Sequence, residues 1–187
     1  KKYQDRLTYL HMKDLSFTER NTFVYEELGD GTLDIPAIVQ AGMEAGVKYY
    51  VVEQDSNWYL TNSAVSNAYD YMGSIKASFD YLRQFFGKDI KDIVPQKPQR
   101  SNPQIQESQL SVQLYSVRDR LSKVSGDYNG IKAVLKEISG IGYKNVEMYN
   151  FLGLTGVQWK KLLQETGLNV SSIHQNVLTS ESQIKTL

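Results

Sequence analysis

Histidine and glutamate side chains lie in or at the ends of strand-like stretches of this sequence. The stretch "RLTYLHM" carries His11, "VKYYVVE" ends on Glu53, and "LNVSSIH" ends on His174. A fourth stretch, "YKNVEMY", carries Glu147. Imidazole and carboxylate groups are suitable ligands for Mn²⁺, Co²⁺, Zn²⁺ or Mg²⁺. Such an ion polarises a carbonyl while a carboxylate moves a proton, so this pattern predicts metal-assisted proton transfer.

The same residues also have structural interpretations. A histidine that follows a strand is more often a hydrogen-bonded structural residue than a ligand. Glu53 ends a strongly apolar stretch, where an unpaired carboxylate is costly, so a functional role is favoured there. For Glu147 and His174 the two interpretations stay open. Lys13 and Asp14 can form a solvated ion pair of little energetic value.

Strand-like and helix-like stretches alternate along the chain, and this alternation would bring the four side chains together. Strands are predicted over 6–12, 47–53, 110–117, 143–149 and 168–174. Helices are predicted over 34–46, 69–86, 127–142 and 154–167. Asp34, Asp127 and Thr155 can cap three of these helices. The spacing predicts right-handed βαβ units and a parallel sheet, hence an α/β fold whose ligands bind at the carboxyl ends of the strands.

Two stretches lack such periodicity. Residues 13–33 are predicted to form a loop that closes on the turn-rich "ELGDGTLD". Residues 88–109 hold three of the four prolines among polar residues. We predict that 88–109 is a linker between a unit at 1–87 and a unit at 110–187.

The composition excludes several classes of protein. The chain has 187 residues, of which 41% are hydrophobic and 22% charged, with a formal net charge of zero. The chain lacks the excess of basic residues that is typical of nucleic-acid binders. The absence of cysteine excludes disulfides and zinc–thiolate sites. Neither a signal peptide nor an apolar run of about 20 residues occurs, so we expect no membrane partner and a cytoplasmic location. The first residue is not methionine and the last strand-like stretch lies close to the end, so both ends are expected to be cut.

The first part of the chain resembles the C-terminal end of a known enzyme family. The stretches "YLHMKD", "ELGDGTLDIPAIVQAGMEAGVKYYVVEQD" and "SIKASFDYLR" are similar to those of the sugar phosphate isomerase/epimerase family, the xylose-isomerase-like TIM barrels. The resemblance covers about residues 3–86. It depends on the His-x-Lys-Asp, Gly-Asp-Gly and Val-Glu-Gln-Asp patterns, which fall in register.

The last part resembles the N-terminal end of the same family. The stretches "SVQLYSVRDRL" and "IGYKNVEMYNFLGLTGVQWKKLLQETGLNVSSIHQNV" are similar to its first three strands and cover about residues 110–177. The resemblance therefore implies a partial (β/α)8 TIM barrel of about five parallel strands with flanking helices, in which the last two strands of the family precede the first three. The chain would be a piece of a tandem protein or, alternatively, a circular permutant. Because the eighth strand of a closed barrel pairs with the first, all five strands would be neighbours in one sheet.

The resemblance also implies roles for particular residues. His11 and Glu53 match metal ligands, and Glu53 also matches one of two catalytic acid/base carboxylates. The second glutamate and an aspartate ligand belong to strands that this chain lacks, so a divalent metal ion is expected to bind weakly. The residues that match substrate-side positions are Lys13, Asp14, Gln113, Glu147 and His174.

The implied function is the isomerisation or epimerisation of a small sugar or sugar phosphate. Proton abstraction next to a carbonyl would give an enediolate, and the proton would return elsewhere. With half of the metal site missing, the chain alone is expected to be inactive. A polyol dehydratase of the same fold, or a non-catalytic sugar-binding or scaffold barrel, is the alternative, and association into a homo-oligomer is left open.

Overall fold

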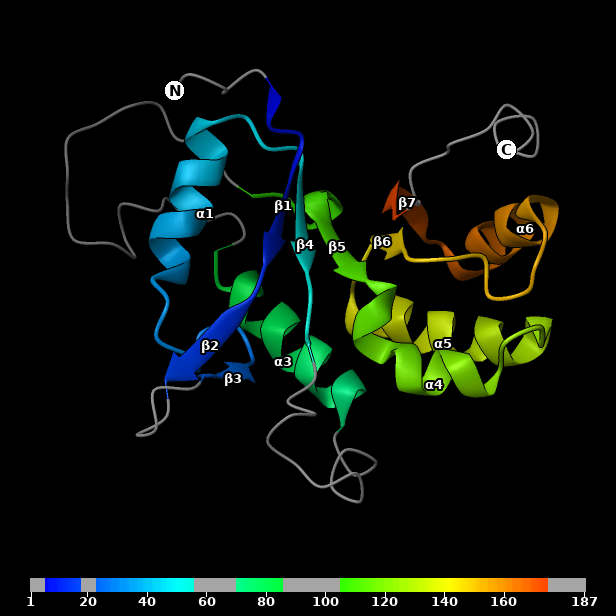
Figure 1. Ribbon diagram of the computed structural model, residues 1–187. Helices are drawn as coiled ribbons and strands as arrows, with labels where there is room; N and C mark the ends of the chain where they lie inside the picture. Colours follow the sequence, from blue (N-terminus) through cyan, green and yellow to red (C-terminus); the bar gives the residue numbers. More distant parts are fainter. Residues whose placement is uncertain (1–5, 18–22, 56–69, 86–104, 175–187) are drawn as a thin grey trace, which may run out of the picture.

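Five parallel strands form the main sheet of this computed structural model, which describes residues 6–17, 23–55, 70–85 and 105–174 (Figure 1). Their order across the sheet is β1-β4-β5-β6-β7. Their bounds are β1 (Tyr9–Met12), β4 (Tyr49–Val52), β5 (Leu110–Gln113), β6 (Asn145–Met148) and β7 (Asn169–Ile173). The predicted parallel α/β sheet is thus confirmed.

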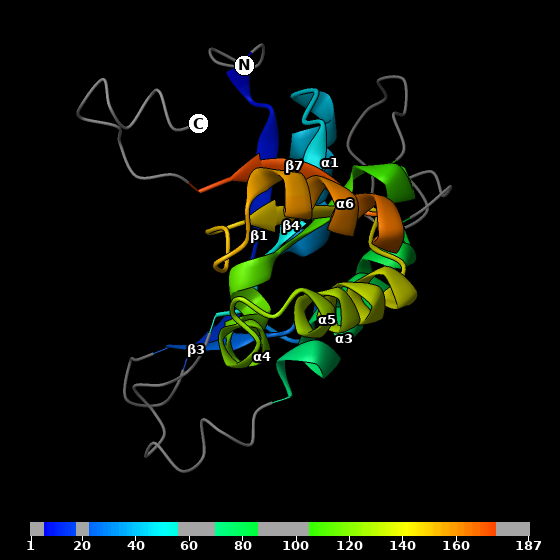
Figure 2. The same cartoon turned by 90° about the vertical axis from the view of Figure 1, so that its right-hand side faces the viewer.

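The helices have the bounds α1 (Ile35–Glu44), α3 (Tyr71–Arg83), α4 (Arg118–Lys123), α5 (Tyr128–Ile141) and α6 (Gly156–Thr166). The three predicted caps are present: the side chains of Asp34, Asp127 and Thr155 accept hydrogen bonds from backbone N–H groups of the first turns of α1, α5 and α6. Figure 2 shows α3, α4 and α5 close together, and contacts join α5 to each of the other two.

Three short elements differ from the sequence prediction. The stretch 13–33 is not all loop, because β2 (Asp14–Phe17) and β3 (Phe23–Glu26) pair antiparallel within it. The predicted strand 110–117 ends at Gln113, where the helical turn η4 (Leu114–Val117) begins. The Gln113 side chain accepts a hydrogen bond from the N–H of Tyr115 and so caps this turn.

The two predicted units share one sheet, because β4 of the first pairs with β5 of the second. Val52 is aligned with Val112 across this pair. Of the predicted linker, residues 88–104 lie outside the described residues, whereas 105–109 belong to the folded body. Ile105 is buried in the core, and η3 (Glu107–Gln109) leads directly into β5.

The two faces of the main sheet differ in chemistry. Alternate strand residues join the helices in one hydrophobic core, and the strand members of this core are Met12, Tyr50, Val52, Leu110, Val112, Val146 and Met148. The intervening residues occupy the opposite face, which includes the buried polar side chains of Ser111, Gln113, Asn145 and Glu147. The functional candidates therefore lie on the face opposite the helices.

This polar face is concave. The hydroxyl oxygens of Ser111 on β5 and Ser171 on β7 are 2.7 Å apart, although β6 lies between the two strands. In a flat sheet these strands would be about 10 Å apart. The rings of His11 and His174, at opposite edges of the sheet, have centroids 5.6 Å apart, whereas four flat strand spacings would be about 19 Å. Strong curvature is thus what brings the edges of the sheet together.

None of the helices in the described part of the chain combines the length and the apolar character needed to cross a membrane.

Tyr143 provides a test of how much a contact between the two units contributes to the stability of the chain. Its buried phenol donates a hydrogen bond of 2.9 Å to the carbonyl of Ile75 in α3, and so joins the second unit to the first. We predict that Tyr143→Phe lowers the free energy of unfolding by about 1 kcal/mol, measured by urea denaturation. Tyr128→Phe is the matched control, because its hydroxyl bonds to Glu165 on the surface and its removal should change stability less. Equal midpoints for Tyr143→Phe and the unmodified chain would contradict the prediction.

Candidate functional site

The candidate residues form a row at the carboxyl ends of the strands. Gln113 on β5 is aligned with Glu147 on β6, and Glu147 is aligned with Ser172 on β7. Glu53 directly follows the last residue of β4, and Lys13 directly follows the last residue of β1, where these two strands are in register. Parallel pairing therefore places one polar side chain from each of the five strands at the same level.

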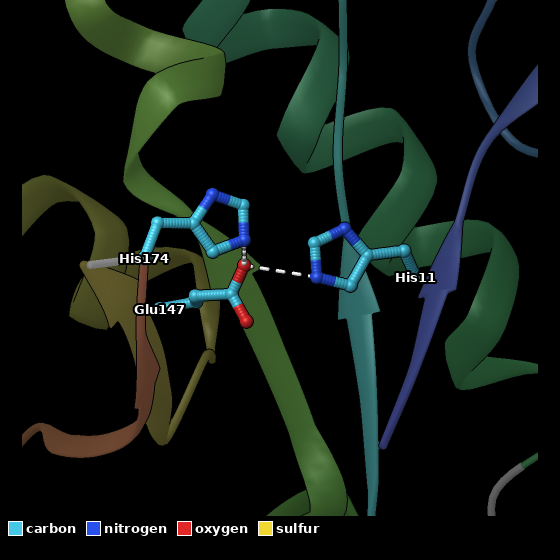
Figure 3. Close-up of side chains that lie close together, drawn as sticks. All are labelled: His11, Glu147 and His174. Carbon is cyan, nitrogen blue, oxygen red and sulfur yellow. Dashed lines mark ion pairs between the residues drawn. The ribbon is translucent and has the colours of Figure 1, made fainter. Parts of the chain in front are cut away.

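The Glu147 carboxylate connects this row to the two histidines, and its side chain is fully buried. His11 Nε2 lies 2.9 Å and His174 Nε2 2.8 Å from its Oε1 atom (Figure 3). The amide of Gln113 donates to the same oxygen, and the hydroxyl of Ser172 donates to Oε2. Both carboxylate oxygens are thus satisfied by side chains, as a buried charge requires.

His11 lies between two carboxylates. Its Nδ1 atom is 2.5 Å from Oε2 of Glu53, while its Nε2 atom faces Glu147. Hydrogen bonds to Glu147 and then to Glu53 raise the pKa of His11 to about 9. Burial acts to raise the pKa of each glutamate. The hydrogen bond from His11, together with Lys13 at Glu53 and with Ser172 and His174 at Glu147, outweighs burial, so both pKa values are lowered. Without a metal ion, the site at neutral pH therefore holds an imidazolium between two carboxylates.

Lys13 extends the ion-pair network to the edge of the site. Its Nζ atom is 2.7 Å from Oδ2 of Asp55 and 3.2 Å from Oε2 of Glu53. Burial acts to lower the pKa of Lys13, but its pairing with these two carboxylates outweighs that effect, and the pKa is raised. The predicted solvated pair of Lys13 with Asp14 is thus replaced by pairing of Lys13 with Asp55 and Glu53.

Asp14, predicted to be a substrate-side residue, lies apart from this group. Its side chain is buried at the start of β2. Its carboxylate accepts hydrogen bonds from the backbone N–H groups of Leu15, Gly29, Gly31 and Leu33. These bonds hold the loop that leads into α1, which gives Asp14 a structural role.

Three of the residues are placed so that they could hold a metal ion. One ligand atom each from His11, Glu147 and His174 lies within 4.8 Å of the others. Two imidazole nitrogens and one carboxylate oxygen suit a divalent transition metal or Zn²⁺. This set differs from the predicted pair of His11 and Glu53, because Glu53 contacts the other nitrogen of His11.

Ser172 is the residue of this site that sequence reasoning missed. A serine in a strand has many uses, and its type alone indicates none of them. The signal available was its position two residues before His174, which by strand alternation places both side chains on one face. The bulge between Val146 and Glu147 that sets the actual pairing has no evident mark in the sequence.

Comparison of the chain with models of protein families, with curated proteins and with solved structures gives no match.

Asp14→Ala tests the structural role of that carboxylate. Removal leaves four backbone N–H groups without their acceptor, so we predict a loss of about 2–4 kcal/mol in the free energy of unfolding. Asp30→Ala in the same loop is the control, because Asp30 is exposed and should be replaceable with little change. Equal losses in the two variants, measured by urea denaturation, would show that the four hydrogen bonds do not stabilise the fold.

His11→Gln tests the charge at the centre of the site in metal-free buffer. A pKa raised to about 9 means that the His11 contribution to stability is complete below its ordinary pKa of 6.5 and disappears as the pH rises through 9. The difference in stability between the unmodified chain and His11→Gln should shrink over this window by an amount on the order of 3 kcal/mol. Denaturation in the presence of EDTA from pH 6 to 10 measures it, and parallel profiles would contradict the assignment.

Proposed function

We propose that this chain is a relative of the sugar phosphate isomerase/epimerase family and carries part of an active site for proton transfer next to a sugar carbonyl. The strand order is the observation that supports this most. The strands that resemble the end of the family barrel, β1 and β4, lie beside β5, β6 and β7, which resemble its beginning. Such neighbours are what closure of an eight-stranded barrel requires.

The site supplies groups suited to that chemistry. A divalent cation held by His11, Glu147 and His174 would polarise a carbonyl and acidify the adjacent C–H bond. Glu53 has a lowered pKa and a side chain that is 11% exposed, so its carboxylate is ionised as a proton acceptor must be. Lys13 lies beside Glu53, Gln113 lies beside Glu147, and both carry N–H donors for sugar hydroxyls.

The proposal includes a limit on turnover. The family pattern has a second acid/base glutamate and an aspartate ligand on strands that the resemblance does not find here. In the family pattern one glutamate removes the proton and the other returns it, so both take part in turnover. The chain is therefore proposed to bind a small sugar or polyol in the cytoplasm without converting it, and a longer or assembled form would supply the missing groups.

Histidine NMR signals test the proposed ligand. Because the chain has two histidines, both of which are in the site, their imidazole signals report binding directly. We predict that a ketose phosphate shifts both sets of signals in the Zn²⁺-loaded chain, and that Glu53→Gln weakens this binding whereas Asp30→Asn, outside the site, does not.

The same samples test the chemistry. No aldose or epimer should form from the ketose phosphate within days, because the acid/base pair is incomplete. Absence of any saturable shift with sugars would remove the proposal. Loss of water from a cyclic polyol would favour the dehydratase alternative, and binding without reaction by a form that contains the missing strands would favour a non-catalytic barrel.

A further inference from the structure

We infer that His11, Glu147 and His174 form a three-ligand site for Zn²⁺ or Co²⁺, that Glu53 positions His11 without binding the ion, and that the ion ties β1 to β6 and β7. This inference deepens the proposed function by naming the ligands of the same site. It can hold even if the site takes no sugar.

The spacing of the donor atoms fits a small ion. Nε2 of His11 and Nε2 of His174 are 2.9 and 2.8 Å from the same oxygen of Glu147. With zinc–ligand bonds of 2.0–2.2 Å in tetrahedral geometry, donor atoms are about 3.3 Å apart. Each histidine nitrogen thus needs to move by only a few tenths of an ångström from the carboxylate oxygen, and all three donor atoms lie within 4.8 Å of one another.

Glu53 provides an independent indication of a metal site. Its Oε2 atom accepts a hydrogen bond from Nδ1 of His11, the nitrogen that does not face the other two ligands. With this contact the Nδ1 proton stays in place, and a bound ion would displace the Nε2 proton of the imidazolium to solvent, so that Nε2 becomes the metal-binding nitrogen. A carboxylate on the far nitrogen of a histidine ligand is a recurrent feature of zinc sites.

The support around Glu147 has the same character. Its second oxygen accepts from Ser172, and Gln113 donates to the oxygen that faces the histidines. These two contacts hold the carboxylate plane toward the concave centre of the sheet. His174, with 52% of its side chain exposed, is the solvent-exposed member of the ligand set. Two nitrogens and one oxygen from the protein favour Zn²⁺ or Co²⁺ over Mg²⁺, which prefers oxygen ligands.

The ligands come from strands that are not neighbours. His11 is on β1, at one edge of the sheet, whereas Glu147 is on β6 and His174 directly follows β7, at the other edge. The ion would therefore replace an ion-pair contact between the two edges by coordinate bonds. Binding should make β1 exchange its amide hydrogens more slowly, because opening of that edge would then require release of the ion.

The experiment uses the full chain after dialysis against EDTA. Calorimetry with Zn²⁺, Co²⁺ and Mg²⁺ should give one-to-one binding for the first two and none for Mg²⁺. Zn²⁺ should shift the imidazole signals of both histidines, raise the melting temperature by about 5 °C at a hundredfold excess over its dissociation constant, and slow amide exchange in β1. Absence of saturable Zn²⁺ binding, or binding without a change in β1, would overturn the inference.

Substitutions separate the ligands from the positioning residue. His174→Gln, at an exposed position where folding should persist, is expected to weaken binding more than any change at Glu53. Glu53→Ala should weaken it about 10- to 100-fold with the stoichiometry kept, and Glu53→Gln, whose amide oxygen can still accept from Nδ1, should restore most of the affinity. Glu165→Gln on the surface of α6 is the control and should change nothing.

Each result has a defined meaning for the inference. Unchanged affinity in His174→Gln would overturn the ligand set. If Glu53→Gln bound no better than Glu53→Ala, Glu53 would be a ligand and its positioning role would be wrong. Sugar is absent from all these measurements, so a failure here is distinct from a failure of the sugar-binding test.

Discussion

The buried carboxylate of Glu147 is the group on which the arrangement of the site depends. A charge without solvent exposure costs several kcal/mol unless donors surround it. Here four donors come from three strands: Gln113 from β5, His11 from β1, and Ser172 and His174 from β7 and the residue that follows it. Because all four donor side chains must reach one carboxylate, the need to satisfy this carboxylate constrains the register, the bulge and the curvature of the sheet at the same time.

Curvature follows from the same constraint. A flat sheet would leave His11 too far from Glu147 and His174 for the contacts that are present. The contact of Ser111 on β5 with Ser171 on β7 shows the same curvature at another level of the concave face. The helices cover the opposite, convex face, where alternate residues of the same strands supply the hydrophobic core. The polar lining and the apolar covering are thus two consequences of one strand periodicity.

Much of this arrangement could be predicted from local sequence patterns. Strand alternation and the capping residues Asp34, Asp127 and Thr155 predict the βα order correctly, and carboxyl-end placement predicts that His11, Glu53, Glu147 and His174 would meet. The geometry of the meeting could not be predicted in this way, because it depends on contacts between segments far apart in the chain.

Two differences show why. Asp14 stands next to Lys13 in the sequence, but the two side chains have different partners: one binds loop amides and the other binds Asp55. The pairing of β2 with β3 depends on cross-strand contacts within a stretch that is rich in turn-forming residues, and composition alone favours a loop there.

The alignment of Val52 with Val112 has a consequence for how the chain folds. The pairing of β4 with β5 joins positions separated by 112 − 52 = 60 residues. The chain must lose the conformational entropy of closing this long stretch before the contacts between the two strands can stabilise it. Each half can begin its own βα contacts early, but the concave face exists only after this distant pairing. The site should consequently be among the last parts of the molecule to form during folding, at a rate limited by this pairing, which has the longest sequence separation of the strand pairings in the main sheet.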